Sequence, residues 1–345
     1  MRKLFLSAIL LLGISVTQAQ IYPSKEWSKA EPAKYGYDSK KLKEVYAYIQ
    51  KELYTTGMMI IVGGESIFEY GSLDRVSYIA SCRKSVLSML YGKYVESGKI
   101  NLDRTLEDLG IDDHGGLLPI EKKATIRHLI QARSGVYHDA SNPGDDAASR
   151  PKRGSKEPGK YYLYNNWDFN VAGAIFEQLT GKNIYKALQK DIAQPIGMQD
   201  FRLENQVKSG NLNASKFPAY HIYFSTRDMA RLGYLMLRGG KWGNKQVISP
   251  EWHKEMLTVW TPASEMNPDK YRNNVEYGYM WWLYYSNNPV FKGAYEARGA
   301  MGQYITVIPA LDMVIAHKTD RVYQRKTPRA KYAKMVEMIV SAKTK

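Results

Sequence analysis

The sequence predicts an α+β fold in which one antiparallel sheet, flanked by helices, is built from both ends of the chain around an inserted helical part. Extended apolar segments with turn signals occur early in the chain and again over its last hundred residues, whereas the segment between them has the spacing of amphipathic helices. The expected division is a discontinuous sheet domain over 20–95 and 240–345 and a mostly helical domain over 96–239.

The first element of the expected sheet is a hairpin from Met58 to Gly71, turning at Gly63-Gly64. Ile79 to Gly98 then changes to helical spacing, because apolar residues recur every four positions and Gly98 ends the run. Further helices are expected over 126–132, 167–180, 225–238 and 328–343, strands over 278–285, 302–309 and 313–318, and a long surface loop over 142–160.

The first nineteen residues have the form of a signal peptide. Met1-Arg2-Lys3 is a basic start, Leu4 to Val16 is apolar, and Thr17-Gln18-Ala19 offers small residues for cleavage before Gln20. The apolar run is shorter than the roughly 20 residues that span a bilayer, and no later segment is apolar enough. We therefore expect export, to the periplasm or as a secreted protein, without stable membrane insertion.

Composition narrows the classes of function. A formal charge of +15 favours contact with anionic cell-envelope polymers, but no nucleic-acid-binding motif accompanies it. The single cysteine, Cys82, excludes an internal disulfide and is expected to face the core. The six histidines are scattered without metal-ligand spacing, so neither a metal nor another cofactor is expected. No Gly-x-Ser-x-Gly elbow is present, which counts against the α/β-hydrolase fold.

Ser81-Cys82-Arg83-Lys84 has the form Ser-x-x-Lys at the start of the expected helix. Residues three apart share a helix face, so Lys84 can take the hydroxyl proton of Ser81 and make it a nucleophile. The alternative for Ser81 is a helix-capping serine. A second match, Ser149 to Lys152, lies in the Pro-rich loop, where the spacing does not place both side chains on one face.

Tyr164 and Asn166 form a Tyr-x-Asn motif that follows Pro158-Gly159 and precedes an amphipathic helix. A phenol beside Ser81 and Lys84 can relay a proton to the leaving group, and an asparagine amide can hold the lysine and a substrate carbonyl. Tyr271 to Asn273 and Tyr285 to Asn287 have the same form but lack both the Pro-Gly lead and a following helix.

In order and spacing, these motifs resemble the class C β-lactamase-related serine hydrolases, part of the serine β-lactamase and penicillin-binding-protein superfamily. The motifs that carry the resemblance are Ser81-x-x-Lys84, Leu129 to Gly135, Pro158-Gly159 with Tyr164-x-Asn166, Thr180-Gly181-Lys182, and Pro195 to Met198. The resemblance covers roughly residues 40 to 340 and implies the multidomain β-lactamase/transpeptidase-like fold.

A third family motif is matched by Ala297 to Gln303, which is similar to the form in the 6-aminohexanoate-dimer-hydrolase-like branch. The resemblance implies that Gly299 lets this strand approach the substrate, and that the backbone N–H groups of Ser81 and Ala300 form an oxyanion hole. Ala297 stands where β-lactamases carry a cation. Arg298 should point to the opposite face, and is expected to be either an ion-pair partner or a substrate clamp.

The sequence thus predicts an exported hydrolase that cleaves an amide or ester of a small molecule or peptide through an acyl-enzyme on Ser81. Lys84 and Tyr164 are the expected catalytic partners, and Asn166, Gly299 and Ala300 the expected substrate-binding residues. The alternative is a protein of the same fold that binds a peptide or cell-wall fragment without turnover. Three intact catalytic residues argue against this alternative.

Overall fold

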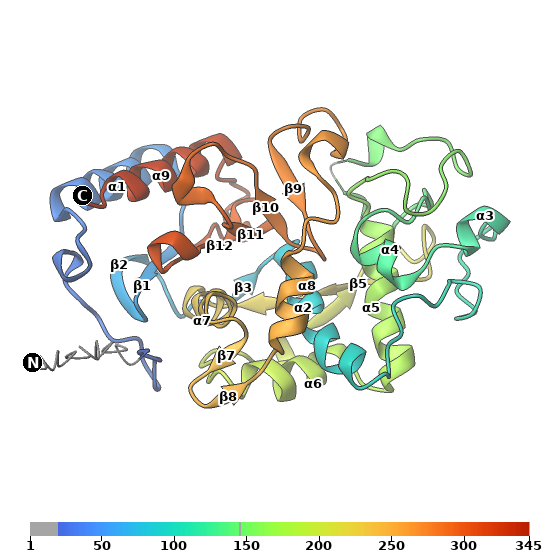
Figure 1. Ribbon diagram of the computed structural model, residues 1–345, viewed down its shortest axis with the longest axis horizontal. Helices are drawn as coiled ribbons and strands as arrows, with labels where there is room; N and C mark the ends of the chain where they lie inside the picture. The colour runs from blue at the N-terminus through green and yellow to red at the C-terminus, as the bar shows by residue number, and fades with distance from the viewer. Residues whose placement is uncertain (1–19, 145, 345) are drawn as a thin grey trace, which may run out of the picture.

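A computed structural model describes residues 20–144 and 146–344, so the expected signal peptide lies outside the described residues. Its centre is a seven-stranded sheet in the order β2-β1-β13-β12-β11-β10-β9, in which all neighbours are antiparallel. The first two strands come from the start of the chain and the other five from its last third (Figure 1). The predicted α+β class, with a sheet drawn from both ends, is confirmed.

The strands of the sheet are β1 (Gly57–Val62), β2 (Glu65–Gly71), β9 (Val275–Tyr277), β10 (Trp282–Tyr284), β11 (Tyr295–Gly299), β12 (Gln303–Ile308) and β13 (Met313–Lys318). Three two-stranded pairs accompany it: β3 (Ser77–Tyr78) with β6 (Tyr223–Phe224), β4 (Val207–Ser209) with β5 (Ala219–His221), and β7 (Lys241–Trp242) with β8 (Lys245–Gln246). The α-helices are α1 (Ser39–Glu52), α2 (Cys82–Glu96), α3 (Pro119–Lys122), α4 (Ile126–Ile130), α5 (Asn166–Thr180), α6 (Ile184–Leu188), α7 (Thr226–Leu237), α8 (Pro250–Leu257) and α9 (Arg329–Ser341).

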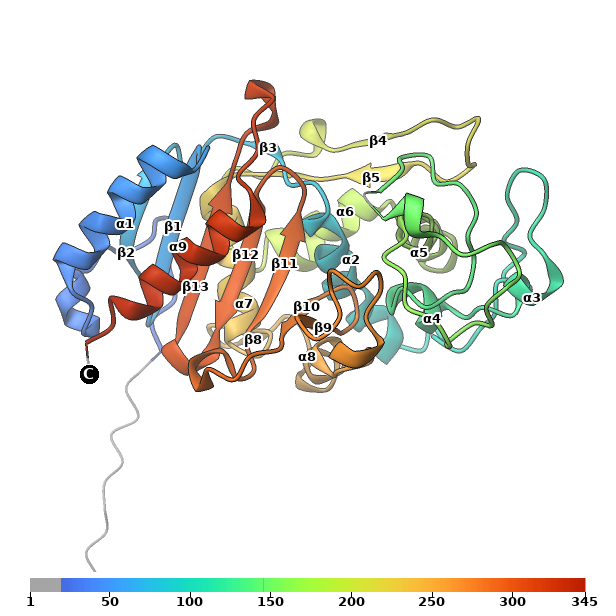
Figure 2. The same cartoon turned by 90° about the horizontal axis from the view of Figure 1, so that it is seen from above.

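The sheet is buried on both faces, and its strands divide their side chains between two cores. Along β13, Met313 and Ile315 belong to the core beneath α1 and α9, whereas Val314 and Ala316 belong to the core that includes α2 and α7. Figure 2 shows α1 and α9 together along one face of the sheet and α7 on the other. The near-continuous apolar sequence of β1 and β13 follows from this double burial.

The helical part lies at one end of the sheet, where α4, α5 and α6 gather beside α2 (Figure 2). Helix α7 contacts β1, β12 and β13, so it covers the sheet although the expected boundary at 239 groups it with the helical part. The division into two domains stays a prediction. No helix within residues 20–144 and 146–344 is long and apolar enough to cross a membrane.

The expected strand over 278–285 is shorter in the structure. Only Trp282–Tyr284 forms β10, because the chain turns sharply before it: Met280 has a φ of 60°, and its N–H binds the carbonyl of Ile130. A left-handed residue cannot continue a strand. This turn joins the sheet to α4 and, through the hydrogen bond from Ser85 Oγ to Met280 O at 2.6 Å, to α2.

Candidate active site

Ser81 sits at the junction of β3 and α2, one residue before the helix begins. Ala80, which precedes it, has a left-handed φ of 49°, an unfavourable conformation for a residue with a Cβ, and a conformation of this kind is often kept at functional sites. Ser81 itself is already helical, and its side chain makes no capping hydrogen bond. The capping alternative is therefore not supported, and the hydroxyl is available for another partner.

That partner is Lys84, which lies one turn along α2 and is almost fully buried. Its Nζ is 3.2 Å from Ser81 Oγ, 2.6 Å from Tyr164 OH and 2.6 Å from Asn166 Oδ1. Two motifs that are distant in sequence thus meet at Lys84 Nζ. The structure brings together the three expected catalytic side chains and Asn166.

Two aromatic rings lie close to the Lys84 side chain. Its Nζ lies 3.9 Å from the centroid of the Tyr164 ring and 4.4 Å from that of Phe169. Burial raises the pKa of the Tyr164 hydroxyl above its usual value, although the hydrogen bond with Ser81 opposes this. Burial likewise raises the pKa of the nearby Asp168 carboxyl well above its usual value, which favours the neutral acid there.

Two rungs of hydrogen bonds join α2 to α5 behind the nucleophile. In one rung, Lys84 binds Asn166. In the other, Arg83 Nη2 donates to Asn170 Oδ1 at 2.7 Å, one turn further along α5. Both asparagines then donate to Asn142, which receives Asn166 Nδ2 at its backbone oxygen (2.8 Å) and Asn170 Nδ2 at its side-chain oxygen (2.9 Å).

This ladder determines which way each amide faces. A backbone oxygen only accepts hydrogen bonds, so Asn166 must turn its Nδ2 toward Asn142 and its Oδ1 toward Lys84. Because a guanidinium only donates, Asn170 must turn its Oδ1 toward Arg83. Sequence reasoning did not find Arg83, Asn142 or Asn170. The four-residue spacing of Asn166 and Asn170, beside adjacent cations in the Ser-x-x-Lys motif, was the available signal.

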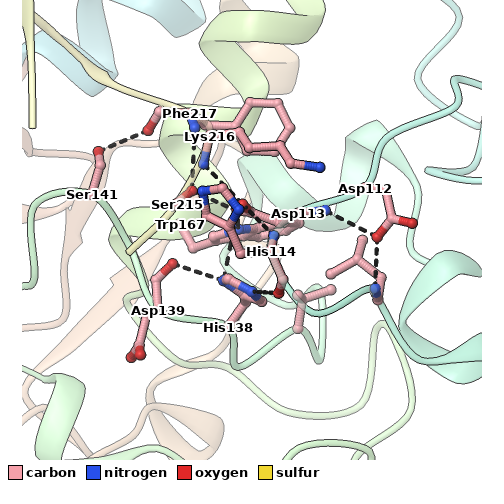
Figure 3. A network of polar contacts seen from close by, with 12 residues as sticks. Asp112, Asp113, His114, His138, Asp139, Ser141, Trp167, Ser215, Lys216 and Phe217 are labelled. Atoms are coloured by element: carbon pink, nitrogen blue, oxygen red, sulfur yellow. Dashed lines mark hydrogen bonds and ion pairs between the residues drawn. The ribbon is translucent and has the colours of Figure 1, made fainter. Parts of the chain in front are cut away.

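A buried carboxylate, Asp113, binds the first turn of α5. Its Oδ2 accepts from Trp167 Nε1 at 2.8 Å and from Ser215 Oγ at 2.5 Å, and its Oδ1 accepts from the backbone N–H of Lys216 at 2.8 Å (Figure 3). Burial by itself would raise the pKa of this carboxyl, but these hydrogen bonds outweigh it and hold the pKa below its usual value. Because Trp167 follows Asn166 directly, the network helps to place the amide that binds Lys84.

Strand β11 and the turn after it contribute backbone groups, not side chains, to the candidate site. At Gly299, a Cβ would lie 2.5 Å from the carbonyl oxygen of Ile79, so only glycine lets β11 come this close to the segment that carries Ser81. Among the described residues, the backbone N–H groups of Ser81 and Ala300 donate to no other backbone or side-chain group. Two N–H groups without partners beside a nucleophile are suited to an oxyanion.

Arg298 is engaged as an ion-pair partner. Its Nε is 2.6 Å from Glu296 Oε1, and its guanidinium lies 4.8 Å from the centroid of the Trp282 ring. Burial would raise the pKa of Glu296, but Arg329 and Arg298 more than compensate and keep the pKa below its usual value. Removing Arg298 would leave a buried carboxylate with less compensation, which gives this arginine a structural reason to be present.

The competing motifs do not reach Lys84. Ser149 and Lys152 are both exposed in the loop that follows residue 146. Tyr271 lies nearer the site and packs on Trp282, but its hydroxyl donates to Asp146. Tyr285 is 54% exposed. The motifs chosen from sequence context are the ones that the fold assembles.

Two openings adjoin different parts of the candidate site. A recess of about 200 Å³ is lined by residues of the 139–150 segment together with Tyr164 and Asn166. A wider groove of about 770 Å³ includes Met301, the neighbour of Ala300, and Arg321. The two openings have no lining residue in common. We call them the amide recess and the arginine groove.

A sheet between two helical layers, with Ser-x-x-Lys at the start of a helix beside a glycine-bearing strand, defines the class of serine β-lactamases and penicillin-binding proteins. Residues 48–336 match the family model described as Beta-lactamase. The chain therefore belongs to the Beta-lactamase family.

Individual relatives are distant. The teichoic acid D-alanine hydrolase of Staphylococcus aureus is 21% identical over 324 residues, which cover 79% of this chain and 78% of that protein. A Bacillus anthracis structure assigned as a 6-aminohexanoate-dimer hydrolase has a TM-score of 0.67 at 18% identity, covering 92% of this chain and 86% of that one. A class C beta-lactamase variant has a TM-score of 0.63 at 14% identity, covering 88% and 98%. Family membership and these hydrolase neighbours support a serine hydrolase.

Proposed function

We propose that the protein hydrolyses an amide or ester in two steps through an acyl-enzyme on Ser81. The observation that carries the proposal is the position of Lys84 Nζ, within hydrogen-bond reach of Ser81 Oγ, Tyr164 OH and Asn166 Oδ1 at once. A nucleophile, a base and an orienting group in contact are the arrangement that covalent catalysis requires.

In the first step, Lys84, assisted by Tyr164, takes the proton of the Ser81 hydroxyl as its oxygen forms a bond to the substrate carbonyl carbon. The negative charge moves to the carbonyl oxygen, where the N–H groups of Ser81 and Ala300 stabilise it. The bond to the leaving group then breaks, and that group receives the proton through Tyr164. Water repeats the sequence on the acyl-enzyme and releases the acid and Ser81.

The same proposal includes export of the chain after cleavage before Gln20, supported by the basic start and the short apolar run. N-terminal sequencing of the protein from the periplasm or the medium tests it. The charge of +15 supports contact with anionic cell-envelope polymers, and one relative is named as acting on teichoic acid. A substrate from the cell envelope is consistent with both features.

Mass spectrometry of the intact protein after incubation with a fluorophosphonate and, separately, with a penicillin tests the chemistry. We expect one adduct per chain, on the peptide that carries Ser81, with the fluorophosphonate. Labelling by the penicillin would indicate that the substrate is a β-lactam or a cell-wall compound, even though Ala297 stands where β-lactamases carry a cation. S81A should lose the adduct and S149A, from the competing motif, should keep it.

If neither the fluorophosphonate nor the penicillin forms an adduct, the proposal is overturned. That result would favour the alternative of a protein that binds a peptide or cell-wall fragment without turnover. Circular dichroism of S81A and S149A separates loss of chemistry from loss of folding.

A further inference from the structure

The arginine groove opens beside the turn that carries Ala300. It is lined by the segment from Arg75 to Tyr78, by Tyr223 of β6 and Met301, and by Asp320, Arg321, Val322 and Gln324. Figure 2 shows the segment that follows β13 rising beyond the sheet beside β3. The groove therefore adjoins the turn that carries Ala300 and Met301 but includes neither Tyr164 nor Asn166.

The charge in the groove is unbalanced. The Asp320 carboxylate is fully engaged, because Oδ2 pairs with Arg75 Nε at 2.7 Å and Oδ1 accepts from the N–H of Val322 at 3.0 Å. Arg321 is exposed, lines the groove and forms no ion pair with any residue that the structure describes. The Arg321 guanidinium can therefore pair with a negative charge on a bound ligand.

Two backbone oxygens of the groove wall, those of Arg75 and Ser77, are bound by a buried lysine. Lys318 is almost fully buried, and its Nζ donates to the backbone oxygens of Arg75, Ser77 and Phe224. A carbonyl oxygen that accepts from a lysine has part of its negative charge compensated, so it repels an anion in the groove less than a free carbonyl would. Lys318 also joins the end of β13 to β3 and β6, which holds the wall in place.

The reaction geometry decides which part of a substrate enters this groove. The leaving group takes its proton through Tyr164, which lines the amide recess, so the leaving group lies on that side of Ser81. The acyl substituent then extends the other way, past Ala300 and Met301. On the strand itself, Ala297 offers no cation and Arg298 is bound to Glu296, which leaves Arg321 as the cation that faces this path.

We propose that the arginine groove receives the acyl chain of a substrate that ends in a carboxylate, with Arg321 as the counter-ion. This inference rests on the proposed function and adds its substrate class. A guanidinium presents a planar fork of donors that matches a carboxylate, so Arg321 selects for that group.

Two esters that differ only at the end of the acyl chain test the inference: mono-4-nitrophenyl adipate, which carries a carboxylate, and 4-nitrophenyl hexanoate, which carries a methyl group. We expect a higher kcat/KM for the adipate ester. R321Q should lower the ratio of the two kcat/KM values about fivefold, as expected for a partly exposed ion pair, and R321K should restore part of it. The matched control is R325Q, which removes an equal charge four residues further on, from a residue that does not line the groove.

An unchanged ratio in R321Q, or an equal change in R325Q, would overturn the inference while leaving the hydrolase intact. If neither ester is turned over, the labelling rate of Ser81 is compared for fluorophosphonates with and without a terminal carboxylate. A rate advantage for the carboxylate reagent that R321Q removes supports the groove, and no advantage overturns it. No labelling by either reagent contradicts the proposed function itself.

Discussion

The amide recess and the arginine groove are built in opposite ways. Around the amide recess, Asn142, Asn166 and Asn170 bind one another and the lysine, so the polar groups there are already committed to the protein. In the arginine groove, Arg321 faces the opening with no ion-pair partner among the described residues. The difference suggests that the recess side orients the chemistry, whereas the groove side is available to select a substrate. A pre-organised donor set serves catalysis, and an unsatisfied charge serves recognition.

Removal of Lys84 should have the largest effect. We expect K84A to lower kcat/KM by about a thousandfold or more. Ser81 would lose its proposed general base, and Asn166 would lose the hydrogen-bond donor to its Oδ1. Steady-state hydrolysis of 4-nitrophenyl hexanoate measures it. K152A, from the competing motif, should behave as the unaltered protein. A loss below about tenfold in K84A would mean that another group activates Ser81.

Replacement of Asp113, which binds the first turn of α5, should have the next largest effect. We expect this effect in the stability of the fold. D113N leaves buried donors facing an amide that can accept fewer of their hydrogen bonds, so we expect the free energy of unfolding to fall by about 2–3 kcal/mol at pH 7. The pKa of Asp113 is lowered in the folded state, so its contribution is present above about pH 4 and is lost as the pH falls further.

Urea unfolding at pH 7 and pH 3 measures this difference. The difference in unfolding free energy between D113N and the unaltered protein should be smaller at pH 3, where the carboxyl of the unfolded chain is protonated. D139N is the control, because the Asp139 side chain is 67% exposed in its pair with Arg150. A gap that is equal at both pH values would contradict the assigned charge state of Asp113.

The asparagine ladder should have a smaller effect that is confined to catalysis. We expect N142A to lower kcat about tenfold with little change in KM, because Asn170 loses the side-chain oxygen that accepts from its Nδ2, which weakens the Arg83–Asn170 contact next to Lys84. N211A tests the same recess without touching the ladder, since the Asn211 side chain accepts only from the N–H of Asn213 among the described residues. Equal losses in both variants would show that the recess acts through its shape alone.

The buried lysine that binds the wall of the arginine groove, Lys318, should give an effect that appears only as the pH rises. Burial lowers the pKa of Lys318 to about 7, against roughly 10.4 in an unfolded chain. Between these values the unfolded state holds more protons, so this group makes stability rise with pH. Compared with K318M, the unaltered protein should gain about 2 kcal/mol in unfolding free energy from pH 7 to pH 9, as measured by urea unfolding. Parallel pH profiles would contradict the lowered pKa.

Much of the fold was predictable because its elements have strong local patterns. The apolar run at 58–62, the turn at Gly63-Gly64 and the four-residue spacing from Cys82 predict β1, β2 and α2 within three residues of their observed bounds. Helix α1 (Ser39–Glu52) was not predicted, since it buries only three residues against the sheet and is otherwise polar. The break before β10 was not predicted either, because the left-handed turn at Met280 depends on a hydrogen bond to α4, far away in sequence.

The candidate site divides in the same way. Ser81 with Lys84 and Tyr164 with Asn166 were recognisable because each pair lies within three residues, where helix geometry or a short loop determines the spacing. Asp113, Asn142 and Asn170 were not recognisable, since each acts through a partner at least 24 residues away. Whether Arg298 clamps a substrate or pairs with the protein was left open by strand alternation, and the contact with Glu296 settles its position.

The sequence by itself determined the class of fold and the candidate residues for catalysis, because periodicity and short motifs are local properties of the chain. Only the tertiary structure decided which amide faces Lys84, why Gly299 has no room for a side chain, and which arginine remains without an ion-pair partner among the described residues. These outcomes depend on packing and charge compensation between segments that are distant in sequence, and no local pattern encodes either.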